Sequence, residues 1–199
     1  MAEDKRSMLV QLSWDEMQRA ADIGTRRRIG ALSRKIAPRY GANNGWEKPW
    51  AMDFLGAAGE LVAARALGLH WTASLDPQRS ESDLVGPYGT EVEVRSAAMA
   101  HFNLIINPLD NDNTPFVLVT GVGPVFRIEG WIFAAEGKKP ELWGCTTNIS
   151  RPCYLVPKDG LRSVHELQSM LSGTNPWLPP WRSVEEALGQ ETEKEQEAK

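Results

Sequence analysis

The sequence predicts one mixed α/β domain, in which helices flank a central mixed sheet whose strands are largely antiparallel. Two stretches before residue 70 combine helix-start signals with helical spacing of apolar residues. Between residues 83 and 128, short apolar runs follow one another and are separated by Gly, Pro and Asn turns. The 199 residues, 42% of them hydrophobic, are enough for one core and too few for two comfortable ones.

The first helix is expected to begin at Ser13, because Ser13 and Glu16 form a capping-box pair. The predicted helical segment covers 13–37, and Pro38 ends it. A second helix is expected after the loop that Pro49 closes, where apolar residues recur near helical spacing and small residues permit a close approach.

The strands are expected to begin with a β-hairpin. Its first strand is Asp83 to Val85, the turn is Gly86 to Gly89, and the second strand is Thr90 to Ser96. Further strands are predicted over Phe102 to Ile106, Phe116 to Thr120 and Val125 to Ile128. The segment 129–143 fits either a short helix or another strand.

The end of the domain is expected to contain a helix opened by Ser163 and stopped by Gly173. This places the core at 50–173. Residues 174–182, rich in Pro and Trp, are expected to form an extended strap that completes a domain of residues 1–182. The acidic tail 183–199 is expected to be flexible.

Several classes of protein are excluded by composition. No run of eighteen apolar residues is present, and charges occupy the start of the chain, so we expect a cytoplasmic protein with no membrane partner. Cys145 and Cys153 lack the spacing of a zinc site or a disulfide scaffold, and both are expected to be buried thiols.

Charge is unevenly distributed along a chain whose formal net charge is −4. The first 48 residues are net basic, and they include the cluster Arg26, Arg27 and Arg28. This cluster fits two interpretations equally well: a solvated helix face, or a surface that contacts nucleic-acid phosphates.

The predicted hairpin gathers charged side chains on one face. Glu91, Glu93 and Arg95 alternate with two valines, so the valines are expected in the core and the charges opposite them. Asp83, on the neighbouring strand, is expected to meet Glu93. The alternation alone is also typical of a solvated strand face, and Glu91 is interpreted as solvated or as a register alternative to Glu93.

Converging carboxylates favour a hard divalent cation, Mg²⁺ or Mn²⁺. An ion held by two or three protein oxygens keeps positions for water and a phosphate oxygen, which is the chemistry of phosphodiester hydrolysis. Glu60 is a further carboxylate, in a mostly apolar helix.

Glu60 on a helix, Asp83 at the start of a strand and Glu93-Val94-Arg95 on the next strand resemble the PD-(D/E)xK nuclease superfamily. The run EVEVRS, followed by FVLVTG and GWI, is also similar to small phage or prophage proteins of that fold. The resemblance implies a restriction-endonuclease-like core, with Asp83 and Glu93 as Mg²⁺ or Mn²⁺ ligands, Glu60 in support and Arg95 in the lysine position.

The same resemblance implies a nuclease acting on nucleic acid, with DNA favoured over RNA as the identity of the substrate, a homodimer, and the host cytoplasm if the protein is phage-encoded. A guanidinium stays protonated, so Arg95 is expected to bind the scissile phosphate, and water activation falls to the metal or to His101. One alternative is a catalytically inactive protein of this fold that binds nucleic acid or a host protein. Another is a structural or assembly protein whose acidic face meets no metal.

The run Asp110 to Asn113 is interpreted as a turn and not as a calcium loop. Pro115 and Gly121 stand where such a loop needs its glycine and its bidentate glutamate.

Overall fold

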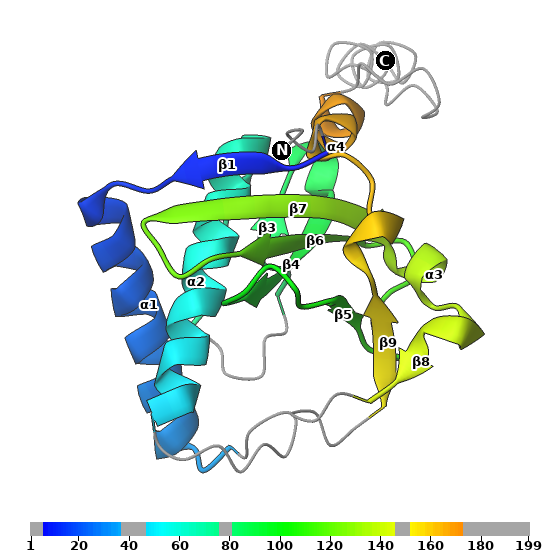
Figure 1. Cartoon of the computed structure of the whole chain (residues 1–199). Helices are drawn as coiled ribbons and strands as arrows, with labels where there is room; N and C mark the ends of the chain where they lie inside the picture. Colours follow the sequence, from blue (N-terminus) through cyan, green and yellow to red (C-terminus); the bar gives the residue numbers. More distant parts are fainter. Residues whose placement is uncertain (1–5, 37–46, 76–80, 146–151, 173–199) are drawn as a thin grey trace, which may run out of the picture.

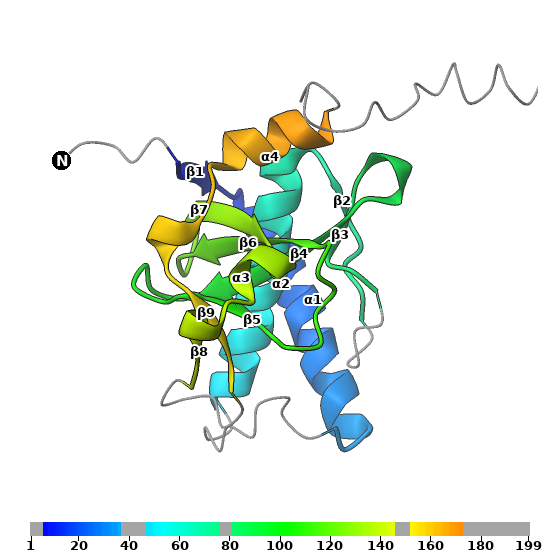
Figure 2. The same ribbon diagram turned by 90° about the vertical axis from the view of Figure 1, so that its right-hand side faces the viewer.

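The computed structural model describes residues 6–36, 47–75, 81–145 and 152–172. Two long helices pack side by side on one face of a six-stranded sheet, and a three-stranded sheet lies on the other face (Figures 1 and 2). The elements, in chain order, are β1 (Met8–Gln11), α1 (Trp14–Ser33), α2 (Glu47–Leu67), β2 (His70–Trp71), β3 (Leu84–Val85), η1 (Pro87–Gly89), β4 (Glu91–Ala97), β5 (Leu104–Ile106), β6 (Pro115–Thr120), β7 (Val125–Phe133), α3 (Ala134–Gly137), η2 (Pro140–Leu142), β8 (Trp143–Gly144), β9 (Cys153–Val156), η3 (Lys158–Gly160) and α4 (Val164–Leu171).

The first helix begins where the sequence predicts it. The Glu16 amide donates to Ser13 Oγ at 3.2 Å, and the Ser13 amide donates to Glu16 Oε2 at 2.7 Å, which completes the capping box. Helix α1 ends at Ser33, earlier than predicted. Helix α2 begins at Glu47, before Pro49 rather than after it, because proline is tolerated in a first helical turn.

Small residues bring the helices close to each other and to the sheet. A Cβ on Gly24 would lie 2.8 Å from the Phe54 Cα, so α1 and α2 are almost in backbone contact there. A Cβ on Gly59 would lie 2.0 Å from Ser96 Oγ, so α2 lies directly on β4. The predicted role of the small residues in the second helix is confirmed.

The large sheet has the strand order β1-β7-β6-β4-β3-β2 and is mixed, as predicted. Strands β4 and β6 are parallel, and the other neighbouring pairs are antiparallel. The connection between the two parallel strands covers 98–114, all of it described, and contains β5 and turns but no helix. This connection places the loop 107–114 beside the outer face of β4.

Two apolar cores lie on opposite faces of the large sheet. The main core joins α1, α2 and α4 to the sheet and includes the buried valines of β4. The second core fills the space between β6 and β7 and the small sheet β5-β9-β8, and includes Phe116, Leu118 and Ile132. Arg95 of β4 lies against this second core, because its guanidinium carbon is 4.7 Å from the centre of the Phe116 ring.

Several features differ from the predictions. The short strands β1, β2 and β9 were not predicted, and the segment 129–143 contains the end of β7, then α3, η2 and the start of β8. Cys153 is buried as expected, but the expectation for Cys145 is wrong, because this thiol is exposed. The strap 174–182 and the tail 183–199 lie outside the described residues.

Within the described part of the chain, no helix has the length and apolar character needed to cross a membrane.

Candidate active site

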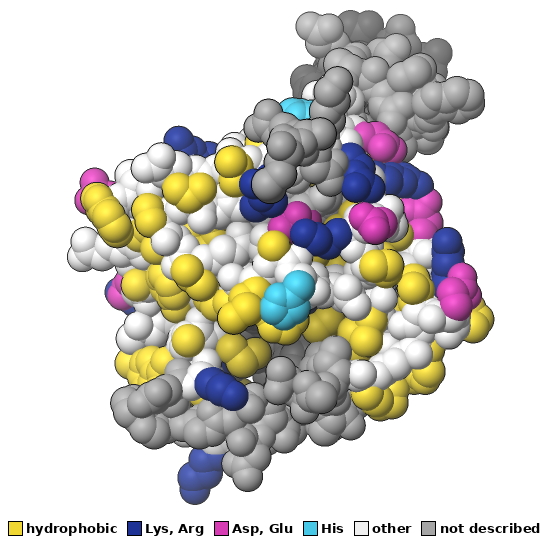
Figure 3. All heavy atoms as spheres, viewed as in Figure 1, with side chains coloured by type: hydrophobic (Ala, Val, Ile, Leu, Met, Phe, Trp, Pro, Cys, Tyr) yellow, Lys and Arg dark blue, Asp and Glu magenta, His cyan; other side chains and the backbone are white. Residues whose placement is uncertain are grey.

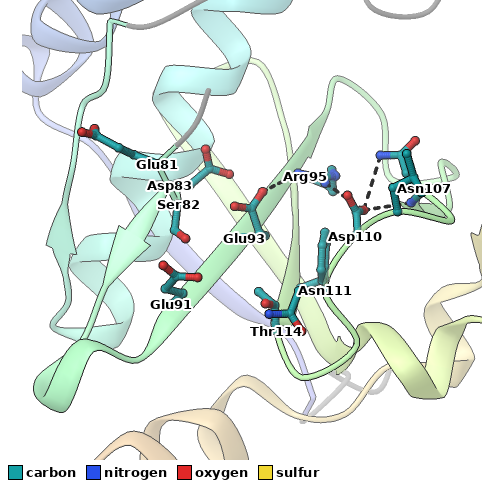
Figure 4. A pocket seen from close by; sticks show the side chains of 12 residues that line it. Glu81, Ser82, Asp83, Glu91, Glu93, Arg95, Asn107, Asp110, Asn111 and Thr114 are labelled. Atoms are coloured by element: carbon teal, nitrogen blue, oxygen red, sulfur yellow. Dashed lines mark hydrogen bonds and ion pairs between the residues drawn. The ribbon is translucent and has the colours of Figure 1, made fainter. Parts of the chain in front are cut away.

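A pocket of about 420 Å³ opens where the outer face of β4 meets the loop 107–114 (Figure 4). Its lining is dominated by polar and charged side chains. The lining residues are Glu81, Ser82, Asp83, Glu91, Glu93, Arg95, Asn107, Leu109, Asp110, Asn111, Thr114 and Phe116.

Strand alternation places the charges of β4 as predicted. Val92 and Val94 are buried in the main core, whereas Glu93 and Arg95 line the pocket. Glu91 is exposed and also lines the pocket, at its outer end. Which carboxylates act chemically therefore depends on their other contacts.

The two predicted metal ligands lie together. Strands β3 and β4 pair through Leu84 and Val92, so Asp83, one position further, lies opposite Glu93 (Figure 4). Asp83 is only 4% exposed, and its Oδ2 accepts the Val94 amide at 2.9 Å. Asp83 directly precedes β3, and its bond to an amide of β4 fixes the direction of the carboxylate.

Several contacts hold the Arg95 guanidinium, among them a bond from Nη1 to the Val94 carbonyl at 3.4 Å. Nη1 donates to Glu93 Oε2 at 3.0 Å, and Nη2 donates to Asp110 Oδ2 at 3.2 Å. Nε donates to the Ile105 carbonyl at 3.3 Å, and the guanidinium carbon lies 4.7 Å from the centre of the Phe116 ring. Arg95 is thus a fixed, permanent cation on the pocket wall, between two carboxylates.

Sequence reasoning missed Asp110. Interpreting its surroundings as a turn is correct for the backbone, since the Asp110 amide donates to the Asn107 carbonyl at 3.1 Å. The turn lies between β5 and β6, and the parallel pairing of β6 with β4 carries the Asp110 carboxylate to Arg95. A cluster of Asp and Asn directly before an apolar run was the available signal.

Glu60 does not line the pocket. It is 1% exposed, and its two oxygens accept from the two terminal nitrogens of Arg27 at 2.8 Å each. The Trp71 indole also donates to Glu60, at 2.9 Å. The observed partners of Glu60 are therefore side chains that join α1 and β2 to α2.

The three consecutive arginines lie in three environments. Arg26 is exposed and pairs with Asp22 one turn earlier, and Arg28 is half-buried and pairs with Asp53. Arg27 is only 4% exposed, so its guanidinium is not accessible to a phosphate at the surface. Of the three, Arg26 has the side chain best exposed for contact with nucleic acid.

The negative charge of Asp83 is one of the influences on the pKa of the buried Arg27. Burial lowers the pKa of Arg27, but the hydrogen bond and charge of Glu60, followed by the charges of Asp83 and Asp53, raise it, and the net direction is upward. Asp83 thus lines the pocket and also contributes to the electrostatics of the Arg27–Glu60 pair.

The donor atoms at the pocket suit a hard cation. Asp83, directly before β3, and Glu93, on β4, both line the pocket with carboxylates, and Glu93 Oε2 accepts from Arg95. Among the described residues, no group of three or more His, Cys, Asp and Glu side chains is arranged to hold a metal. Mg²⁺ is commonly held by one or two carboxylates, with waters and substrate phosphates completing its shell, so a two-carboxylate site fits it.

The other predicted participants lie outside this group. The His101 ring stacks on Phe102, with ring centres 4.6 Å apart, and does not line the pocket. On the face shown in Figure 3, Lys and Arg side chains lie among Asp and Glu side chains rather than in a continuous basic stripe.

No protein-family model matches the sequence, and no match is found among the curated proteins. The residues and geometry of the pocket are therefore the features that indicate a function.

Proposed function

We propose that the pocket binds Mg²⁺ or Mn²⁺ between Asp83 and Glu93 and hydrolyses phosphodiester bonds of nucleic acid, with DNA rather than RNA as the proposed substrate. In this proposal the chain is a divergent PD-(D/E)xK nuclease with a restriction-endonuclease-like core. One observation carries the proposal: two carboxylates on adjacent strands lie together in a polar pocket, and an arginine lies two residues beyond the second.

A bound divalent cation would supply a Lewis acid and an activated water at neutral pH. The chain's own residues orient and balance charge. The Val94 amide fixes the Asp83 carboxylate, and Arg95 fixes that of Glu93. Arg95 cannot accept a proton, so its part is to bind the phosphate and stabilise the negative charge that develops on it.

Glu60 acts on this site at one remove. Its bidentate bond fixes Arg27, and the Arg27 charge in turn interacts with Asp83. We therefore assign Glu60 and Arg27 to the support of Asp83 rather than to direct contact with the ion or the substrate.

A second candidate is a catalytically inactive protein of the same fold that binds nucleic acid or a host protein. Two features of Arg95 favour it. Arg95 already pairs with Glu93 and Asp110. It also stands in the position of the motif's lysine, a side chain that can exchange protons whereas arginine cannot. The Arg95→Lys variant separates the two candidates. A nuclease keeps part of its activity or changes its preference between Mg²⁺ and Mn²⁺, whereas an inactive binder shows no turnover in either form.

The direct test is cleavage of supercoiled plasmid, linear duplex, single-stranded DNA and RNA with Mg²⁺ or Mn²⁺. We expect Glu93→Gln to lower the rate by at least about 100-fold, because it removes a proposed ligand. The matched control is Glu91→Gln, the same change on the same strand and in the same pocket, which should keep most of the activity. Absence of cleavage by the unaltered protein, or equal rates for the two variants, would refute the proposed chemistry.

A further inference from the structure

The Asp110 carboxylate is held by a small group of hydrogen-bond donors that together form an anion-binding site. Three donors converge on its Oδ2: Arg95 Nη2 at 3.2 Å, the Asn107 amide at 2.8 Å and Asn107 Nδ2 at 3.4 Å. The same kinds of donor, a guanidinium and a backbone N–H, bind phosphate oxygens in proteins. The three donors therefore suit a phosphate oxygen as well as they suit a carboxylate.

The loop that forms this site is fixed by bonds that do not use the Asp110 carboxylate. The Asp110 amide donates to the Asn107 carbonyl at 3.1 Å, and the Thr114 amide donates to the Asn111 carbonyl at 3.1 Å. Lys138 Nζ binds the Asp110 carbonyl and, at 2.6 Å, Asp112 Oδ1. The Asp110 side chain can thus turn away while the backbone of the loop stays in place.

The carboxylate also has room to turn. The Asp110 side chain is 21% exposed and borders the pocket of about 420 Å³ in which the substrate phosphate is proposed to bind. Figure 4 shows it on the opposite side of Arg95 from Glu93. A phosphate that approaches the ion between Asp83 and Glu93 therefore reaches Arg95 beside Asp110.

We infer that Asp110 occupies the place on Arg95 and Asn107 that a backbone phosphate of the nucleic acid takes on binding. Asp110 then limits the affinity for nucleic acid, because the phosphate must displace it. This inference rests on the proposed function and adds to it a phosphate subsite and a residue that sets its strength. It also explains how Arg95 binds substrate although carboxylates hold it in the free protein.

The test is the affinity of the full chain for fluorescein-labelled duplex and single-stranded DNA, measured by anisotropy in EDTA so that no cleavage occurs. Asp110→Asn keeps an oxygen for the Asn107 amide but removes the competing charge. We expect binding to tighten by about fivefold or more, the order of one charge-assisted hydrogen bond. Glu91→Gln makes the same change of net charge in the same pocket without a bond to Arg95, and should change the affinity by less than about twofold.

The double variant tests whether the effect passes through Arg95. In an Arg95→Gln background, Asp110→Asn should no longer tighten binding. If Asp110→Asn does not fold, as judged by circular dichroism, Asp110→Ser removes the same charge and keeps a hydroxyl near Asn107. A gain no larger than that of Glu91→Gln, a gain that persists without Arg95, or no DNA binding by any variant would overturn the inference.

The inference and the proposed function fail in different ways. If the protein cleaves DNA with Mn²⁺ but Asp110→Asn binds no more tightly, the phosphate subsite is wrong and the nuclease assignment stands. If Asp110→Asn tightens binding through Arg95 but no cleavage occurs with either metal, the subsite is supported and the catalytic assignment is wrong.

Discussion

Replacing Arg27 by methionine takes the bidentate cation away from the buried Glu60 carboxylate. Glu60 is 1% exposed and Arg27 is 4% exposed, and each of the two bonds between them is 2.8 Å long. Methionine retains much of the side-chain volume, so the expected loss comes from the charge left behind rather than from a cavity. Removing one partner of such a pair costs about 3–5 kcal/mol of unfolding free energy.

The neighbouring arginines provide matched controls. Arg26→Met removes an exposed pair with Asp22 one helical turn away, so its expected cost is at most about 0.5 kcal/mol. Arg28→Met removes a half-buried hydrogen bond to Asp53 of 2.7 Å and should cost an intermediate amount, about 1.5–3 kcal/mol. The double variant Arg27→Met/Glu60→Met removes both buried charges and should regain most of what Arg27→Met loses.

The assay is equilibrium unfolding in urea, followed by tryptophan fluorescence. We expect the loss of unfolding free energy to be largest for Arg27→Met, smaller for Arg28→Met and smallest for Arg26→Met, with the double variant more stable than Arg27→Met alone. A cost below about 1 kcal/mol for Arg27→Met, or equal costs for the three arginines, would contradict the buried ion pair.

Three further predictions concern packing and the cysteines. Gly24→Ala should lower stability by about 1 kcal/mol or more, because a clash with the Phe54 backbone outweighs the gain in helix propensity; unchanged or higher stability in urea would contradict the close contact of α1 and α2. Ser96→Ala should be neutral or stabilise by about 1 kcal/mol, because the buried Ser96 Oγ has no hydrogen-bond partner among the described residues, and a clear loss in thermal denaturation would show a hidden bond. A thiol reagent should modify Cys145 quickly and Cys153 only on unfolding. Burial, and then the charge of Cys145, raise the pKa of Cys153. The contribution of the Cys153 thiol to stability is therefore complete below the pKa of an unfolded thiol and is lost as pH rises through the folded pKa. A Cys153→Ala variant that loses as much stability as the unaltered protein between pH 7 and pH 10 would refute this.

Local signals predicted much of the fold. The Ser13–Glu16 capping box and the Gly86 to Gly89 turn are short-range patterns, and both lie where they were expected. Strand β2 is decided by pairing with β3 rather than by its own two residues, and β9 is decided by pairing with β5 and β8. The residues of such short segments do not predict a pairing partner that is distant in the sequence.

The candidate site was predicted in part for the same reason. Asp83, Glu93 and Arg95 lie on one hairpin, where strand alternation and register determine which side chains meet. Asp110 reaches Arg95 through the connection between two parallel strands, which local patterns do not reveal. Glu60 points toward Arg27 instead, because a buried carboxylate pairs with the nearest buried cation. A charged residue on an apolar helix indicates a buried partner, but not which one.

A crystal structure of the protein soaked in Mn²⁺, with data collected to reveal anomalous scattering, tests the proposed metal site. We expect a peak between Asp83 and Glu93, at about 2.0–2.3 Å from carboxylate oxygens, that is lost in Asp83→Asn crystals soaked in the same way. A map without a peak at this position, or with a peak that persists in Asp83→Asn, would contradict the proposed metal site.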